Sequence, residues 1–147
     1  MKTYKEKKAR QGFTMVELMA VLIILGLLAG VVVKNFVGQT ERAKVTTTKA
    51  SLKELSSAVY QFYMDNNRYP TEDMGLVELV VQPSDCPNWQ PNGYLNSTDV
   101  PPDGWGREFI FELYPENGKP FVIISRGADG QEAGEGYNAD LYSTDAF

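Results

Sequence analysis

The hydrophobic pattern divides the chain into an unbroken apolar segment, an amphipathic segment and a mixed C-terminal part. Residues 13–33 are almost wholly apolar and contain a single charged residue, Glu17. A helix of this length, at about 1.5 Å per residue, measures ~31 Å, which is enough to cross the ~30 Å hydrocarbon core of a bilayer. The pattern therefore predicts a membrane-spanning helix over residues 13–34.

The helical pattern continues beyond this segment in amphipathic form. From Thr40 to Asn66, charged residues occupy one face, and apolar or small residues recur with roughly helical period on the other. No proline interrupts residues 13–69, and the polar run 66–70 ends in Pro70. We therefore predict one continuous helix whose second half packs against a domain. The apolar stripe consists of Ala43, Ala50, Leu52, Leu55, Ala58, Val59, Phe62 and Tyr63.

The remaining residues predict a small domain of the α+β class. Thr71 is a candidate N-cap for a short helix that covers the long one, and residues 82–105, rich in Pro, Asn, Asp and Gly, predict an ordered loop. Runs of β-forming residues predict a hairpin and a third short strand in an antiparallel sheet. The predicted elements are a helix over 72–81, strands over 109–114 and 121–125 joined through 115–120, and a strand near 141–143.

Charge is distributed unevenly along the chain. The first 12 residues hold five basic residues and one acid, whereas the remainder holds nine basic and 18 acidic residues. Positive residues beside an apolar span tend to stay in the cytoplasm, so we expect the acidic remainder to lie across the membrane. An acidic body also argues against nucleic-acid binding, which requires a basic surface.

The chain has one cysteine, Cys86, and no histidine. An intramolecular disulfide is therefore impossible, and we expect Cys86 to be structural, with an intermolecular link as the less favoured alternative. The absence of histidine removes the commonest acid–base and zinc-binding side chain. Because no nucleophile–base pair is recognisable either, the sequence argues against an enzyme.

The basic leader and the apolar segment do not form an ordinary secretory signal. Such a signal has its cleavage site after the apolar core, whereas here the only attractive site, Gly12–Phe13, lies before it. The run Gly12-Phe13-Thr14-Met15-Val16-Glu17 resembles the class III signal of type IV pilins and type II secretion pseudopilins. The plain alternative is a signal-anchor helix that contains an acid by chance.

This resemblance implies three roles. A prepilin peptidase would cleave after Gly12 and methylate the new N-terminus at Phe13, and Glu17 would pair with the N-terminal amine of a neighbouring subunit. A carboxylate in lipid is tolerable when it meets an ammonium group, so the last role is physically reasonable. The implied domains are a removed leader (1–12), a transmembrane and filament-core helix (13–34) and a periplasmic pseudopilin domain (35–147).

The resemblance extends through the C-terminal part, although two positions depart from it. The run 67–71 with Gly75-Leu76 is similar to the GRYPTTEQGL pattern of the major pseudopilin, and 93–95 and 125–130 are similar to its GYL and S-x-GADG pieces. Residues 103–106 are similar to its DPWG piece, with Gly104 in place of proline. Lys34 also stands where most relatives have a proline, which removes a helix breaker. The resemblance implies a type IV pilin-like fold.

Residues 127–140 form an acidic, glycine-rich segment that is a candidate calcium site. Like charges repel unless a cation neutralises them, and Ca²⁺ prefers six to eight hard oxygen ligands on a flexible loop. Composition alone leaves an ordinary solvated loop equally open. The resemblance implies Ca²⁺ bound by Asp129, Asp140, the backbone carbonyl of Arg126 and, at a more variable position, Glu135. Glu132 is expected to face solvent.

Together these features predict a non-enzymatic inner-membrane subunit that assembles into a homo-oligomeric helical filament in the periplasm, where it drives export of folded proteins. The implied partners are the prepilin peptidase, minor pseudopilins, an inner-membrane assembly platform and membrane lipid. A minor pseudopilin or a type IV pilin is the nearest alternative. A minor pseudopilin often lacks an acid at the position equivalent to Glu17, and a typical type IV pilin carries a C-terminal disulfide. This chain has the acid and cannot form the disulfide. An anchored periplasmic binding module, with a ligand in the 82–105 loop, would need no cleavage at Gly12.

Overall fold

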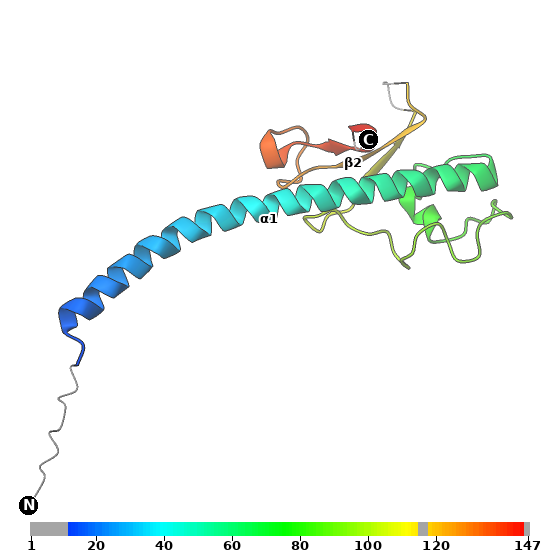
Figure 1. The fold of residues 1–147 in the computed structure, drawn as a ribbon. Coiled ribbons are helices and arrows are strands. Elements are labelled where there is room, and N and C mark those ends of the chain that lie inside the picture. Colours follow the sequence, from blue (N-terminus) through cyan, green and yellow to red (C-terminus); the bar gives the residue numbers. More distant parts are fainter. Residues whose placement is uncertain (1–11, 115–117, 146–147) are drawn as a thin grey trace, which may run out of the picture. The chain divides into compact units, whose positions relative to one another are not determined.

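The computed structural model describes residues 12–114 and 118–145, with only the backbone described at 33–37. The chain divides into two compact units, residues 1–38 and 39–147. The described elements, in chain order (Figure 1), are α1 (Met15–Asn66), η1 (Gly75–Leu79), β1 (Ile110–Leu113), β2 (Phe121–Ser125), η2 (Gly136–Asn138), β3 (Leu141–Tyr142) and η3 (Ser143–Asp145).

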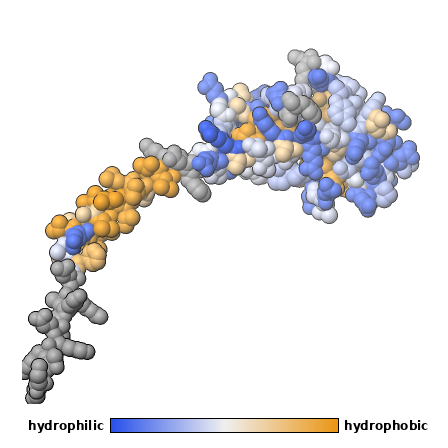
Figure 2. Space-filling view, viewed as in Figure 1, coloured by the Kyte–Doolittle hydropathy of each residue, from blue (hydrophilic) through white to orange (hydrophobic). Residues whose placement is uncertain are grey.

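Helix α1 is a single α-helix of 52 residues, as the sequence predicts, and it continues through Lys34. It ends where Asn67 takes a left-handed conformation (φ 55°) and its N–H donates to the carbonyl of Tyr63 (2.8 Å). Such a residue commonly closes a helix, because it satisfies one of the last free carbonyls. Residues 15–32 are long and apolar enough to cross a membrane, and none of them is buried within the chain. Figure 2 shows this part of α1 as a nearly continuous hydrophobic surface.

The second half of α1 supplies one wall of the hydrophobic core. Leu52, Leu55, Val59 and Phe62 have no exposed surface. They pack in one cluster with residues of η1 and β2, and both of these elements lie along this half of the helix (Figure 1). The predicted apolar stripe is therefore correct at its centre.

The stripe is wrong toward its N-terminal end, and it leaves out two buried polar residues. Ala43 and Ala50 are exposed, whereas Thr48 and Ser56 are buried. Thr48 tolerates burial because its hydroxyl donates to the carbonyl of Lys44 (2.9 Å) and accepts from the N–H of Gly104 (2.8 Å). A buried polar group that is fully hydrogen-bonded avoids the desolvation cost, which a hydrophobicity pattern cannot anticipate.

The three strands form an antiparallel sheet in the order β1-β2-β3. Leu113 pairs with Phe121 and Ile110 with Ile124, so β1 and β2 form the predicted hairpin, whose residues 115–117 lie outside the described part. All five residues of β2 are buried, because this strand lies between β1 and β3 and contributes side chains to the same core as α1. The predicted strands are thus confirmed, each within one or two residues of its bounds.

The short helix predicted over 72–81 is a turn followed by the five-residue 3₁₀-helix η1. Gly75 has a positive φ (52°), which interrupts an α-helix before it can form. Thr71 is therefore not the N-cap of η1, which is Met74; its hydroxyl instead accepts the N–H of Met74 (3.4 Å) within the preceding turn. Leu76 and Leu79 are buried in the core, so the element covers α1 as predicted.

Residues 82–105 form neither helix nor strand, as predicted, yet they hold part of the core. The indole N–H of Trp89 donates to the carbonyl of Glu78, and the N–H of Tyr94 donates to that of Leu79, both at 2.8 Å. Cys86 is buried in the same cluster. Burial raises the pKa of its thiol, which favours the structural role predicted for it.

Candidate functional site

The residues of the predicted processing site lie at the start of α1. Gly12 and Phe13 are exposed and precede the helix, and 88% of the surface of Phe13 is accessible. A Cβ built on Gly12 meets nothing within 4 Å. The fold itself therefore does not require glycine at this position.

Glu17 forms a capping box with Thr14. The Thr14 hydroxyl accepts the N–H of Glu17 (3.2 Å), and the Glu17 carboxylate accepts the N–H of Thr14 (2.9 Å). Each side chain thus satisfies a backbone donor that the first turn of a helix leaves free. The motif is readable in the sequence as Thr14-x-x-Glu17, although the hydrophobic pattern alone does not indicate it. It holds the carboxylate one residue away from the predicted mature N-terminus.

In unit 39–147, Arg68 holds two segments of the C-terminal part together. Its guanidinium donates to Glu78 (2.7 Å) and, through two nitrogens, to Asp85 (2.8 and 3.0 Å). The other oxygen of the buried Glu78 carboxylate accepts from the hydroxyl (2.5 Å) and N–H (3.1 Å) of Thr71. Arg68 and Thr71, which lie in the run 67–71 that carries the family resemblance, therefore form a polar network that anchors η1 and the 82–105 loop.

Asp103 organises a second network, which leads to the acidic segment. Its carboxylate accepts from the N–H groups of Trp105 and Arg107 (both 2.9 Å) and from the hydroxyl of Ser125 (2.6 Å). Arg107 in turn donates to the carbonyl of Gly127 (2.7 Å). The two sequence pieces at 103–106 and 125–130, which are remote in the chain, are thus neighbours in space.

The structure explains why glycine replaces proline at position 104. A Cβ at Gly104 would collide with the backbone carbonyl of Lys44 on α1. The N–H of Gly104 also donates to Thr48, a bond that proline could not make. Nearby, the indole N–H of Trp105 donates to Glu41 at 2.8 Å. This segment is therefore held tightly against α1.

The acidic segment is closed at its base by backbone contacts. The N–H of Ala128 donates to the carbonyl of Tyr137 (2.9 Å). Gly127 has a positive φ (58°), and a Cβ there would lie 2.7 Å from the carbonyl oxygens of Asn138 and Ala139. Only glycine allows this close approach. The closure brings Asp140 next to Arg126.

The buried carboxylate of Asp140 is half satisfied. Its Oδ2 accepts from Arg126 Nη1 (2.9 Å), from the N–H of Ala133 (3.2 Å) and from the Tyr142 hydroxyl (3.4 Å). Its Oδ1 has no hydrogen-bond partner in the described part of the chain. A buried carboxylate oxygen without a donor is costly, and a cation is one way to satisfy it.

The other predicted ligands occupy different environments. Asp129 is exposed and accepts the N–H of Gln131 (3.0 Å), whereas the carbonyl of Arg126 accepts the N–H of Gly130 (3.1 Å). Glu135 and Glu132 are exposed. Among the described residues, no three acidic, cysteine or histidine side chains are close enough to hold a metal ion.

The described residues supply the kind of oxygen atoms that Ca²⁺ prefers. Their carboxylates, however, are not gathered around one point. Asp140 Oδ1 supplies an unpartnered oxygen, and backbone carbonyls crowd the base of the segment. Calcium accepts carbonyl and carboxylate ligands in variable numbers, so few acids are needed. Against it, the Arg126 guanidinium already neutralises part of the Asp140 charge.

The fold combines a long N-terminal helix, whose first half is apolar and uncovered, with a small antiparallel sheet packed on its second half, and this is the architecture of type IV pilin-like subunits. A family model described as the prokaryotic N-terminal methylation motif matches residues 7–33, and the model of type II secretion system protein G matches residues 35–144. The chain therefore belongs to the type II secretion system protein G family.

Similar proteins agree with this assignment. The type II secretion system core protein G of Pseudomonas aeruginosa is 37% identical over 143 residues, which cover 95% of this chain and 99% of that protein. The protein of the same name from Vibrio cholerae is 37% identical over 93% of each chain. The crystal structure of the major pseudopilin from the type 2 secretion system of enterohaemorrhagic Escherichia coli matches with a TM-score of 0.60 and 29% identity, covering 74% of this chain and 92% of that one.

These matches decide between the predicted functions. The chain is a structural subunit of the pseudopilus of a type II secretion system and is not an enzyme, and the major pseudopilin is favoured over a minor pseudopilin or a type IV pilin. Its methylation motif implies a prepilin peptidase. The apolar helix and this motif fit anchoring in the inner membrane, with the pseudopilus in the periplasm.

Proposed function

We propose that the chain is inserted with its leader in the cytoplasm and residues 35–147 in the periplasm, cleaved after Gly12, methylated at Phe13 and then assembled into the filament. Minor pseudopilins and an inner-membrane platform are the assembly partners. The observation that carries this proposal is the uncovered apolar surface of residues 15–32, which nothing else in the described chain buries. Lipid would cover it before assembly, and the same helices of other copies would cover it afterwards.

The capping box fixes the position of the Glu17 carboxylate close to the N-terminus that cleavage would create. Cleavage after Gly12 would create an ammonium group on Phe13, next to the Thr14 N–H that the carboxylate already accepts. Glu17 would then pair with the N-terminus of a neighbouring copy, because a carboxylate inside an apolar filament core needs a cation. This pairing would fix the axial register of adjacent subunits.

The intact mass of the membrane-extracted protein tests the processing step. We expect a mass that corresponds to residues 13–147 plus one methyl group. Gly12→Val should leave the full-length precursor, since a peptidase that approaches the backbone before Phe13 favours a residue without a side chain. Gly26→Val is a matched control, because Gly26 is equally open in the structure. Normal cleavage of Gly12→Val would contradict the proposed site.

Protease protection tests the orientation. We expect a protease added to spheroplasts to digest residues 39–147 and to spare the leader of the Gly12→Val precursor. Digestion only after the inner membrane is permeabilised would reverse the proposed topology.

We further propose that the acidic segment binds Ca²⁺ through Asp140, Asp129 and the Arg126 carbonyl, with Glu135 as an additional ligand. The support is the unpartnered Oδ1 of Asp140 together with the closed base of the segment. A bound ion would stabilise the folded state, because the unfolded chain does not present these oxygens together. Mg²⁺ should act much more weakly, since it demands tight octahedral geometry.

A thermal melt of the detergent-solubilised chain, with Ca²⁺ or with chelator, tests this site. We expect Ca²⁺ to raise the melting temperature and chelation to make the segment after Ser125 sensitive to protease. Asp129→Ala should abolish the response, whereas Glu132→Gln, which changes an exposed acid of the same segment, should preserve it. An unchanged melt of the wild-type protein would show that the segment is ordinary solvated surface.

A further inference from the structure

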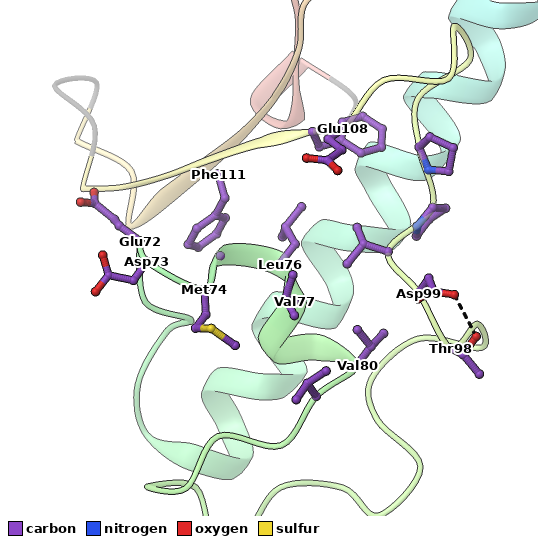
Figure 3. A pocket seen from close by; sticks show the side chains of 16 residues that line it. Glu72, Asp73, Met74, Leu76, Val77, Val80, Thr98, Asp99, Glu108 and Phe111 are labelled. Atoms are coloured by element: carbon purple, nitrogen blue, oxygen red, sulfur yellow. Dashed lines mark hydrogen bonds between the residues drawn. The ribbon is translucent and has the colours of Figure 1, made fainter.

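A groove with an apolar floor lies on unit 39–147, between η1, the segment 98–102 and the start of β1 (Figure 3). Its volume is about 460 Å³. The side chains of Met74, Val77 and Val81 remain between 42% and 50% exposed there, and Val80 and Phe111 complete the floor. The floor is thus the outer side of the hydrophobic core, and Met74, Val77 and Val81 leave apolar surface open on it.

Four acidic side chains surround this floor, and we call the whole feature the acidic-rimmed groove. Figure 3 shows Glu72 and Asp73 at one end, Glu108 at another and Asp99 on the far side. All four are exposed, and none of them forms a salt bridge with a described residue. An apolar floor inside an acidic rim suits long basic side chains, which bury their aliphatic stems and keep the charged group at the edge.

The chain carries a matching surface on α1. Arg42, Lys49 and Lys53 are exposed and follow one another at spacings of seven and four residues. At 3.6 residues per turn they lie within about 40° of one another around the helix and extend over ~16 Å along it. We call these three residues the basic stripe. Arg42 and Lys49 form no salt bridge with any described residue.

We propose that, in the pseudopilus, the basic stripe of one copy binds in the acidic-rimmed groove of an adjacent copy. The proposal rests on the assembly of this subunit into a filament and names the surfaces through which the periplasmic units meet. Complementary charge argues for this occupant, since the rim is wholly acidic and the stripe wholly basic.

The type of symmetry agrees with this occupant. The groove and the stripe are different surfaces of the same unit, so their contact is heterologous. Heterologous contacts that do not close into a ring generate helical filaments, whereas a self-complementary patch generates closed dimers. Each copy would offer one groove and one stripe, and the contact would repeat along the filament.

Charge reversal in the full-length, membrane-inserted protein tests the pairing. We expect Asp99→Lys and Lys49→Glu each to lower the amount of assembled filament at least about fivefold, because each reversal removes a charge pair and also brings like charges together, which costs more than the pair alone. Combining the two should restore assembly to near the wild-type amount. Glu112→Lys is a matched control, because Glu112 is an exposed acid of β1 that does not line the groove. Melting temperatures of all variants establish that they fold.

Two results of this experiment would overturn the proposal. One is assembly of the single variants at the wild-type level. The other is a combined variant as defective as the product of its two parents. A wild-type chain that forms no filaments under the same conditions would instead count against the filament function itself, so the two failures are distinguishable.

Disulfide cross-linking provides a second, independent measurement. A chain carrying both Lys49→Cys and Asp99→Cys should give a ladder of dimers, trimers and longer species in intact filaments. Each single cysteine variant should give none, because a heterologous contact never brings two copies of one position together. The native Cys86 is buried and serves as an internal negative control. Dimers from a single variant, cross-links to a different protein, or no ladder in intact filaments would contradict the proposed contact.

Discussion

The two halves of α1 belong to one helix but differ in what covers their apolar side chains. In the first half, large apolar residues surround the helix and stay open, as in Leu22, which is 60% exposed. In the second half one face is buried, and Leu55 and Phe62 have no exposed surface because they pack in one core with residues of β2 and η1. Secondary structure is thus the same in both halves, whereas burial depends on what the rest of the chain supplies.

This difference teaches where each half obtains its stability. The second half gains from burial within the same chain, at about 25 cal/mol per Å² of apolar surface removed from water. Residues 15–32 gain no such burial from the described part of the chain, so we expect this half to depend on lipid or on other copies. Substitutions in the two halves should therefore separate assembly from folding.

The largest effect expected from this comparison is on assembly. Glu17→Ala should insert normally, because the helix becomes more apolar, but filaments should be almost absent. The free energy of unfolding of unit 39–147 should change by no more than about 0.5 kcal/mol, as is typical of remote substitutions, so its melting temperature should stay almost the same. Filament counts by electron microscopy, together with a thermal melt, measure both quantities.

Two further variants distinguish the charge of Glu17 from its capping role. Glu17→Gln retains an oxygen that can accept the Thr14 N–H but carries no charge, and Thr14→Ala removes the reciprocal cap. We expect the former to fail in assembly and the latter to assemble. Normal filaments from Glu17→Gln would show that capping, rather than charge pairing, explains the residue.

A matched pair of leucine substitutions should separate the two halves by their effect on folding rather than on assembly. Leu55→Ala should destabilise unit 39–147 by about 2–5 kcal/mol, because it opens a cavity in a fully buried site. Leu22→Ala, on the same helix, should leave the melt of that unit unchanged. Equal effects of the two substitutions on the melting temperature would contradict the division of the helix into two stability regimes.

A somewhat smaller loss is expected from Arg68→Ala. The change leaves the buried Glu78 carboxylate without its cation, although Thr71 still donates to it. Breaking a buried pair in this way costs about 3 kcal/mol, at the lower end of the usual range because Arg68 is partly exposed. Denaturant unfolding measures the loss, with Arg42→Ala as an exposed control. Partial rescue by adding Glu78→Gln would identify the unpaired charge as the cause.

The smallest expected effect is the dependence of folding stability on pH. The hydrogen bonds from Arg68 lower the pKa of Asp85, and those from Trp105 and then Lys44 lower the pKa of Glu41. Groups whose pKa is lower in the folded state stabilise it above their ordinary values of 3.8 and 4.5, and this contribution disappears as the pH falls further. The melting temperature should therefore decrease below about pH 4.5. Glu41→Gln should make the decrease shallower, and an identical pH profile would contradict this assignment.

Local sequence was sufficient to predict the elements but not their polar connections. The strands at 110–113 and 121–125 were predictable because β-forming runs and turn residues are local signals. The hydrogen bond from Ser125 to Asp103 joins residues 22 positions apart, and Gly104 contacts Thr48 across 56 positions. No periodicity reports contacts between segments so distant in the chain.

The sequence by itself determined the long helix, its apolar N-terminal half, the antiparallel sheet and the motifs that indicate the family, because each of these depends on the order of neighbouring residues. Only the tertiary structure decided that η1 is a 3₁₀-helix, that Thr48 and Ser56 are buried, and that Asp140 lies against Arg126. It also placed four acids around one apolar floor. The physical reason is that burial and charge pairing depend on which distant segments the fold brings into contact, and that information exists only once the chain has packed.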